Sequence, residues 1–477
     1  MSELTLTCDQ AIFTSVRSPT GEGYRIIAAS KGLKPEEKQI ITRYSPSHEG
    51  LCAGLIDPET AKALAPAVTF YELPTGRLCV SISTTAGAEH TGRGGQRVYT
   101  HVAVFDAKEL VKLGFNPFAV ARAMIAAGLA QPELKPQQVL PELPLAIGDT
   151  APPRTLRFPA AMHSVCRKHV LSSMLNNRSV VLDIGASWLD TAELLLMGVP
   201  GPLRSKTSVA SGLKFSAGRC QRLNVTQDEK NAARNRSAGQ PFEFVEPETV
   251  RAADASGAWI SFVDRHWEKG EFTAVARRTS RPFADATPTG RERLGKLYTL
   301  IDEVVSIETP RLLTTAGEYL PHVKESKEAE LMNEFIAAAS RELDNRLRRQ
   351  PWRESKPQWA AVQALWRHDA NCRTFAAPLL RAMLRAASGV DMLDACETAA
   401  EWERARGELR LDDRDLAAVE DLISRCAAWA ELARDIEPQR LRRLCHLLAP
   451  LRPHCPIVDR MQRRCDTLEA ASVSTVR

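Results

Sequence analysis

Several features that define membrane, secreted or disulfide-bonded proteins are missing from this sequence of 477 residues. No apolar run reaches the roughly 18 to 20 residues that a membrane-spanning helix needs. The N-terminus carries Glu3 and Asp9 where a secretory signal has basic residues followed by an apolar segment. The eleven cysteines are scattered and form no Cys-x-x-Cys pair, as is typical of a reducing compartment. We therefore expect a cytoplasmic protein without a membrane span.

The sequence also lacks the Gly-x4-Gly-Lys-Ser/Thr motif with which P-loop proteins hold GTP or ATP. Residues 183–187 follow an apolar run and resemble the first phosphate loop of sugar kinases and actin-like ATPases. A helix is expected directly after them, however, and no second phosphate motif is found. A strand-to-helix turn capped by Ser187 explains these residues better. We therefore expect no nucleotide and no other cofactor.

Zinc-binding residue types occur near the C-terminus: Cys445, His446, His454, Cys455 and Cys465. Structural zinc sites usually present paired ligands two to four residues apart on turns, whereas adjacent residues of a helix point in different directions. We therefore expect no metal site. The lack of a catalytic signature favours a protein that is not an enzyme.

The balance of charge is only slightly basic, at +5, but it is uneven. Residues 341–367 carry seven Lys or Arg against three acidic residues, and residues 438–465 carry seven Arg against one Asp. Such clusters attract nucleic acid, anionic lipid or acidic proteins, and they also fit the solvated face of a helix. Aromatic residues make up only 6% of the chain, which argues against base stacking and hence against a nucleic-acid partner.

The first third of the chain has the patterns of short strands and a helix. Residues 97–105 alternate between two largely apolar faces, which predicts a central strand covered on both sides. Pro117 opens a helix over 118–130, and the proline-rich residues 132–159 predict a linker or an extended wrapping segment. Further strands are expected at Leu4–Cys8, Ala11–Val16, Tyr24–Ser30 and Arg77–Ser83. We predict an α+β domain over residues 1–150.

Residues 160–290 alternate between helical and strand patterns, which indicates an α/β domain with some parallel pairing. The expected helices are Met162–Leu175, Ser187–Met197 and Glu248–Glu268, and the expected strands are Ser179–Ile184, Val209–Ser216, Arg219–Val225 and Phe242–Val245.

From Leu294 onward the apolar residues recur at helical spacing, which predicts an α-helical domain over residues 294–477. One stripe consists of Leu331, Phe335, Ala339, Leu343 and Leu347. Another helix begins after Asp412 or Asp413, either of which suits an N-cap. No exact repeat is found, although successive antiparallel helices fit the pattern.

Two runs of the first third, Tyr24–Ser30 and Thr91–Val102, resemble the N-terminal domain of bacterial GTPase-associated proteins. Residues 200–205, 211–216 and 219–223 resemble the middle domain of the same family. The resemblance implies an adaptor or effector scaffold without enzyme activity, working with a small GTPase or another protein partner in a bacterial signalling or defence system. It covers roughly residues 1–300 and assigns no role to the helical C-terminal domain.

The candidate binding residues are those of the glycine-rich loop and the strand after it: Gly92, Arg93, Gly94, Gly95, Arg97 and His101. Glycine N–H groups and arginine side chains suit the recognition of a carboxylate or phosphate. The loop leads into a strand rather than a helix, so a hairpin turn is the plainer interpretation, and His101 also fits an interior position. Two other functions stay open. One is a hydrolase-like enzyme using a Cys or His of the N-terminal domain, and the other is nucleic-acid binding through the basic helices.

Overall fold

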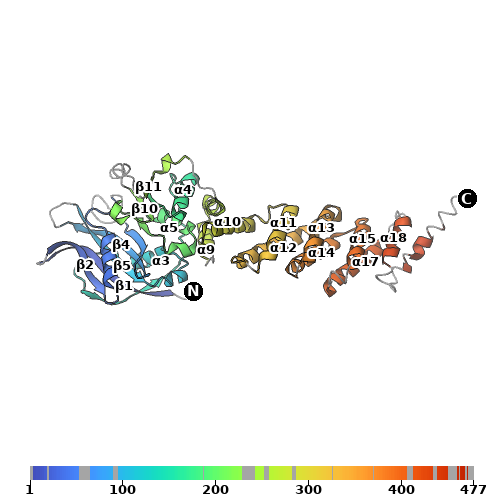
Figure 1. Cartoon of the computed structure of the whole chain (residues 1–477), viewed down its shortest axis with the longest axis horizontal. Helices are drawn as coiled ribbons and strands as arrows, with labels where there is room; N and C mark the ends of the chain where they lie inside the picture. Colours follow the sequence, from blue (N-terminus) through green and yellow to red (C-terminus); the bar gives the residue numbers. More distant parts are fainter. Residues whose placement is uncertain are drawn as a thin grey trace. The chain divides into compact units, whose positions relative to one another are not determined.

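The computed structural model describes residues 4–18, 21–52, 65–89, 95–185, 187–227, 242–251, 257–281, 286–324, 326–368, 370–404, 412–432, 438–448, 459–460, 462–467 and 470. The chain divides into two compact units, Met1–Lys296 and Leu297–Arg477, with the boundary inside helix α10 (Pro288–Glu303). The first unit combines a mixed sheet with helices, and the second is helical (Figure 1). The predicted change from a mixed N-terminal region to a helical C-terminal region is confirmed.

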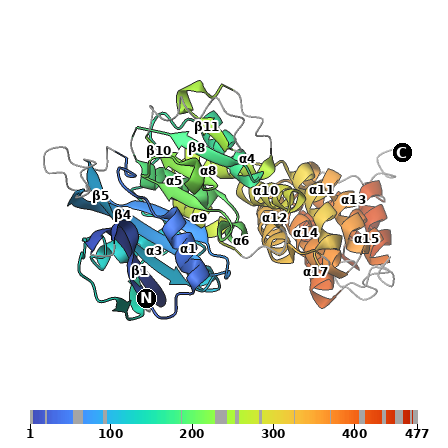
Figure 2. The same ribbon diagram turned by 60° about the vertical axis from the view of Figure 1, so that its left-hand side comes forward.

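A mixed sheet of eleven strands runs through the described part of the first unit (Figures 1 and 2). Ten of its strands follow one another in the order β11 (Phe242–Val245), β8 (Ser179–Asp183), β10 (Leu223–Thr226), β9 (Val209–Ser211), β3 (Ala67–Glu72), β4 (Leu78–Ala88), β5 (Gln96–Phe105), β1 (Leu4–Ser18), β2 (Gly21–Ser30) and β6 (Val139–Leu140). The remaining strand, β7 (Leu143–Ile147), pairs with the first residues of β1. Pairing is parallel from β11 to β9 and antiparallel from β9 to β2.

The pairing of β9 with β3 joins the predicted N-terminal and middle regions in one sheet. Val68 lies opposite Ser211 and Phe70 opposite Val209. The proline-rich segment 132–159 contributes β6 and β7, so it lies along the sheet as a wrapping segment. Domain boundaries near residues 150 and 160 remain a prediction.

Buried polar contacts reinforce this junction. Glu193 accepts hydrogen bonds from Arg122 Nη1, at 2.7 and 2.8 Å, and from Asn116 Nδ2 at 2.8 Å. Burial raises the pKa of Glu193, while Arg122 opposes that shift. Arg204, which is fully buried, donates to the carbonyl of Gly114 at 3.2 Å. The regions on either side of residue 150 are therefore held together by polar contacts as well as by strand pairing.

Three predicted elements of residues 160–290 are wrong in extent. The strand from Val209 ends at Ser211, because Gly212 turns the backbone with a φ of +77°. The strand expected from Arg219 begins only at Leu223, after a short 3-10 turn and a turn closed by the side chain of Asn224. The helix expected from Glu248 is a 3-10 turn at Pro247–Thr249 followed, after residues outside the described part, by α8 (Ala258–Glu268).

Strand β5 is central, as its pattern predicts, because it lies between β4 and β1. Its two faces belong to different core clusters: Val102 packs against helix α1 (Pro35–Tyr44), and Tyr99 packs with Ile12 and Ala28. The first unit also contains the helices α2 (Glu109–Lys112), α3 (Pro117–Ala126), α4 (Ser164–Leu175), α5 (Trp188–Gly198), α6 (Gly201–Arg204), α8 and α9 (Phe272–Thr279).

The second unit consists of helices stacked in two layers (Figure 1). One layer contains α11 (Thr309–Tyr319), α13 (Trp352–His368), α15 (Asp391–Arg404) and α18 (Pro438–Leu448), and the other contains α12 (Ala329–Arg349), α14 (Ala370–Ala386) and α17 (Asp413–Leu432). The predicted stripe from Leu331 to Leu347 is buried on α12. Asp412 caps α17, since its side chain accepts from the Asp415 backbone N–H at 2.8 Å.

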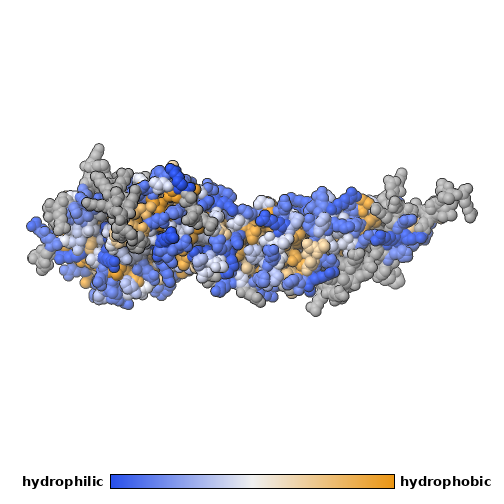
Figure 3. Space-filling view, turned by 45° about the horizontal axis from the view of Figure 1, so that its top comes forward, coloured by the Kyte–Doolittle hydropathy of each residue, from blue (hydrophilic) through white to orange (hydrophobic). Residues whose placement is uncertain are grey.

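None of the described helices is both long and apolar enough to cross a membrane. On the face drawn in Figure 3, hydrophilic residues cover most of the surface of both units, and hydrophobic residues form smaller areas between them.

Candidate functional site

Strand β2 forms an open edge of the sheet. It pairs with β1 from Gly21 to Ala29, with a bulge at Ile27, but β6 pairs only with Ala29 and Ser30 on its other side. Among the described residues, 22–28 have no strand on that side. Alternate N–H and C=O groups of an unpaired edge are available to another strand.

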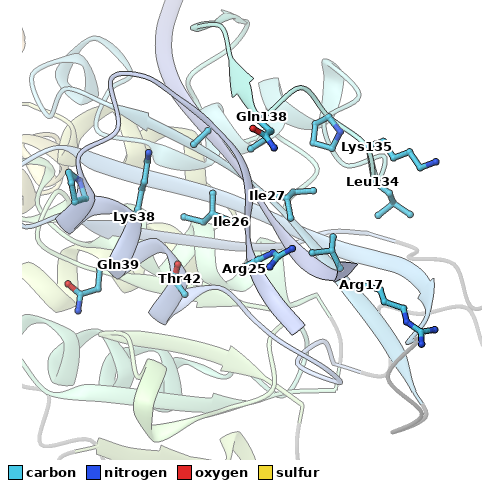
Figure 4. Close-up of a pocket in the computed structure, with 15 residues that line it drawn as sticks. Arg17, Arg25, Ile26, Ile27, Lys38, Gln39, Thr42, Leu134, Lys135 and Gln138 are labelled. Carbon is cyan, nitrogen blue, oxygen red and sulfur yellow. The ribbon is translucent and has the colours of Figure 1, made fainter. Parts of the chain in front are cut away.

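A groove of about 980 Å³ runs along this edge (Figure 4). One wall is helix α1, through Pro35, Lys38, Gln39 and Thr42, and the other is the segment from Leu134 to Gln138. Residues Ile26 to Ala29 of β2 lie between the two walls. We call this feature the β2 groove.

The β2 groove is positively charged. Arg17, Arg25, Lys38 and Lys135 line it, and its lining contains no carboxylate. Arg17 pairs with Glu22 at 2.7 Å, whereas the other three cations have no ion pair within the described residues. A cleft lined by one sign of charge attracts ligands of the opposite sign.

A β-bulge shapes the floor of the groove. Ile12 lies opposite Ala28, but the next residue of β1, Phe13, lies opposite Ile26, so Ile27 is the extra residue. Ile26 packs with the core cluster under α1, and Ile27 packs with the cluster on the other face. Bulges are frequent at sheet edges, where they redirect side chains.

The glycine-rich loop predicted as a binding site is a hairpin connection between β4 and β5. Gly92, Arg93 and Gly94 lie outside the described residues. The described end of the loop is closed by pairing of Ala88 with Gln96 and by a bond from the Glu89 N–H to the Gly95 carbonyl at 3.0 Å. Gly95 has a φ of +79°, and a Cβ there would come within 2.7 Å of Glu49 Oε1.

Glu89 anchors this loop to the β1–β2 hairpin, and the sequence patterns gave no sign of it. Its carboxylate accepts from Ser15 Oγ at 3.2 Å and from the Tyr24 hydroxyl at 3.0 Å, and the Tyr24 oxygen accepts from the Val98 N–H at 3.0 Å. Burial, assisted by Glu89, raises the pKa of Tyr24 well above its ordinary value, so this hydroxyl remains a donor at neutral pH. An acidic residue at the end of a buried strand, beside a glycine-rich loop, is the signal that could have identified it.

The two remaining candidate residues, Arg97 and His101, make separate contacts. Arg97 Nη2 donates to the Ala86 carbonyl of the neighbouring strand at 2.8 Å. His101 is 4% exposed, and its Nε2 lies 2.9 Å from Gln10 Oε1. Burial lowers the pKa of His101 to about 4, so the ring is neutral at pH 7. The structure therefore places His101 in the interior and Arg97 in a cross-strand contact.

Among the described residues, the environments of Cys8 and Cys79 do not favour nucleophilic chemistry, and possible metal ligands are not grouped. Burial raises the pKa of both Cys8 and Cys79 to about 12, which keeps the thiols protonated and weakly nucleophilic. No group of three or more possible metal ligands is found among the described residues, and His454 and Cys455 lie outside them. Ser187 begins α5 in a left-handed conformation without a side-chain cap bond, so the predicted capping role is wrong.

The N-terminal part of the chain therefore contains a sheet with an open edge and a groove along that edge. Residues 7–145 match the family model of GTPase-associated protein 1, N-terminal domain type 2. The match supports the resemblance of this region to the N-terminal domain of GTPase-associated proteins. The match ends before residues 160–290, whose resemblance to the middle domain remains a prediction. No curated protein matches the sequence.

Proposed function

We propose that this protein is a non-enzymatic adaptor that binds a small GTPase through its N-terminal domain, in a bacterial signalling or defence system. The observation that carries the proposal is the overlap between the family match and the β2 groove. Every residue lining the groove lies between Val16 and Gln138, within the matched residues 7–145. The groove is open and charged, as a protein-binding surface is expected to be.

The second unit suits a scaffold. Its stacked helices are joined by polar contacts between successive helices of each layer. Arg381 Nη1 pairs with Asp415 Oδ1 at 2.5 Å, and Arg353 Nε pairs with Asp391 Oδ1 at 2.6 Å. Stacked helices provide extended surfaces for further partners.

Nucleic-acid binding through the basic helices is the weaker alternative, because the cluster at residues 341–367 is largely occupied. Arg346 donates to the carbonyls of Ile307 and Val305 at 2.5 and 2.6 Å. Lys356 pairs with Asp394 at 2.7 Å. Cations engaged in such contacts are less available to phosphates.

Affinity enrichment on the intact chain tests the proposal. Lysate from cells of its own species is supplied with GDP or with a non-hydrolysable GTP analogue, and captured proteins are identified by mass spectrometry. We expect a P-loop GTPase in the captured set, with its amount dependent on the nucleotide. Capture of no GTPase under either condition contradicts the proposal.

Turnover provides a second test. The purified chain is expected to hydrolyse neither GTP nor ATP, since its sequence contains no P-loop motif to position Mg²⁺ and the γ-phosphate. Steady hydrolysis that disappears in Asp183→Ala would replace the adaptor proposal with an ATPase.

A further inference from the structure

We infer that the β2 groove receives an extended acidic segment of a partner protein, which adds to the sheet as a strand beside β2. The inference rests on the proposed protein-binding role of the N-terminal domain, but it does not require the partner to be a GTPase. It specifies the mode of binding and the chemistry of the bound segment.

The backbone supports strand addition. Residues 22–28 of β2 form a free edge within the described structure, and at about 3.4 Å per residue this edge is roughly 24 Å long. β6 already occupies the same edge beside Ala29 and Ser30, and the Ala29 N–H donates to the Gln138 carbonyl at 3.1 Å. An added strand would therefore continue the line of β6. Main-chain hydrogen bonds to an exposed edge are a common mode of peptide recognition.

The walls of the groove specify the side chains of that strand. Successive residues of a strand point to opposite faces, so the bound segment would present alternate side chains to α1 and to the segment from Leu134 to Gln138. Each wall offers one lysine, Lys38 on α1 and Lys135 opposite, and Arg25 is exposed on β2 itself. Acidic residues on either face of the bound strand would thus lie near a cation. Leu134, which is 38% exposed, suits an apolar residue on its side.

The same charges argue against a second copy of this chain as the occupant. Two copies paired through their β2 edges would bring Arg25, Lys38 and Lys135 of each close to those of the other. Charged residues along edge strands prevent such self-pairing. A groove that repels copies of itself and attracts carboxylates selects an acidic strand.

Fluorescence polarisation with the intact chain tests the inference. The probe is a labelled peptide of about eight residues that alternates Glu and Val, a length that matches the free edge. The comparison peptides replace Glu by Lys, or carry N-methyl groups on alternate amides of the Glu-Val sequence. We expect binding of the Glu-Val peptide that weakens with added salt, and binding about tenfold weaker for both comparison peptides.

The matched variants are Lys38→Glu/Lys135→Glu in the groove and Lys206→Glu/Lys269→Glu at exposed positions outside it. Both change the net charge equally, and thermal melts establish that both fold. The groove variant should bind the Glu-Val peptide at least about tenfold more weakly than the control variant. Equal binding by the two variants, or undiminished binding of the N-methylated peptide, overturns the inference. The inference is also overturned if light scattering shows that the parent chain is a dimer and that the groove variant is a monomer.

Capture of the GTPase by the same variants distinguishes a failure of the strand-addition inference from a failure of the proposed adaptor function. If the GTPase is captured equally by the groove and control variants while the peptide result fails, strand addition is wrong and the adaptor role stands. If the peptide binds as expected and no GTPase is captured, the groove has a different acidic partner.

Discussion

Arg204 offers a strong test of how the first unit is held together. Its side chain is fully buried, and the described contacts are made with uncharged groups. Nε donates to the Val199 carbonyl and Nη2 to the Met197 carbonyl, both at 2.8 Å, and Nη1 reaches the Gly114 carbonyl at 3.2 Å. Burial lowers the pKa of Arg204 to about 9, so the guanidinium stays charged at pH 7. Two of the acceptors lie at the C-terminal end of α5, where the helix dipole favours a cation.

Replacement by methionine keeps the apolar stem and removes the donors. The Val199 carbonyl would then be buried without its donor, at about 1 to 3 kcal/mol. The Met197 and Gly114 carbonyls would each lose one hydrogen bond but keep another, from Thr279 Oγ1 at 2.8 Å and from Ser280 Oγ at 2.7 Å. Part of that loss is offset because a charge no longer has to be buried. We expect Arg204→Met to lower the free energy of unfolding of the first unit by about 2 to 4 kcal/mol. Arg204→Lys should lose less, because an ammonium retains the charge and some of the hydrogen bonds.

Hydrogen exchange measured by mass spectrometry on the intact chain is the suitable assay, because a chain of two units need not unfold in one step. Faster exchange is expected in peptides that cover Met197 to Val199, Gly114 and the end of α9, and not in peptides from α12 to α17. A change of less than about 1 kcal/mol in Arg204→Met would refute the reasoning. So would an equal loss of protection in the helical unit.

Three smaller predictions concern single side chains. Burial lowers the pKa of His101 from its ordinary 6.5 to about 4, so on acidification the unfolded chain binds a proton before the folded chain does. The free energy of unfolding should therefore fall by about 3 kcal/mol as the pH drops from 6.5 to 4. Urea unfolding of His101→Gln, measured over the same pH range, should lack this decrease. Gly201→Ala should destabilise the first unit by about 1 to 3 kcal/mol, since the new Cβ would lie 2.7 Å from Phe115 Cδ2, and an unchanged melting temperature would contradict this. Lys356→Ala should lower the free energy of unfolding of the helical unit by about 0.5 kcal/mol or less, because its ion pair with Asp394 is half exposed. A loss above about 2 kcal/mol would show that the pair is structural.

The sequence predicts those helices and strands whose apolar residues recur with a regular spacing within one segment of the chain. The alternation of residues 97–105 identified β5 and its two buried faces, and the stripe from Leu331 to Leu347 identified the buried face of α12. The position of a strand within the sheet depends on partners far along the chain, which periodicity does not report. The pattern of Tyr24–Ser30 predicts a strand, but its place at the open edge follows from pairing with β1 on one side and with only two residues of β6 on the other.

In the candidate site, too, local patterns are predictable and contacts between distant residues are not. The glycines and arginines before β5 predict a binding loop, and the described end of that loop is a hairpin connection. The carboxylate of Glu89, which fixes that loop to Ser15 and Tyr24, involves sequence separations of 74 and 65 residues. The β2 groove is similarly assembled from α1, β2 and residues 134–138, so no single segment of sequence contains its pattern.

The proposed adaptor role requires that the N-terminal region binds a GTPase. The most direct measurement is a calorimetric titration of the purified, captured GTPase into the intact chain, once with the non-hydrolysable GTP analogue and once with GDP. The account predicts saturable one-to-one binding that differs between the nucleotides by at least about tenfold in Kd. Absence of binding with either nucleotide, at concentrations where both proteins remain folded, would contradict it.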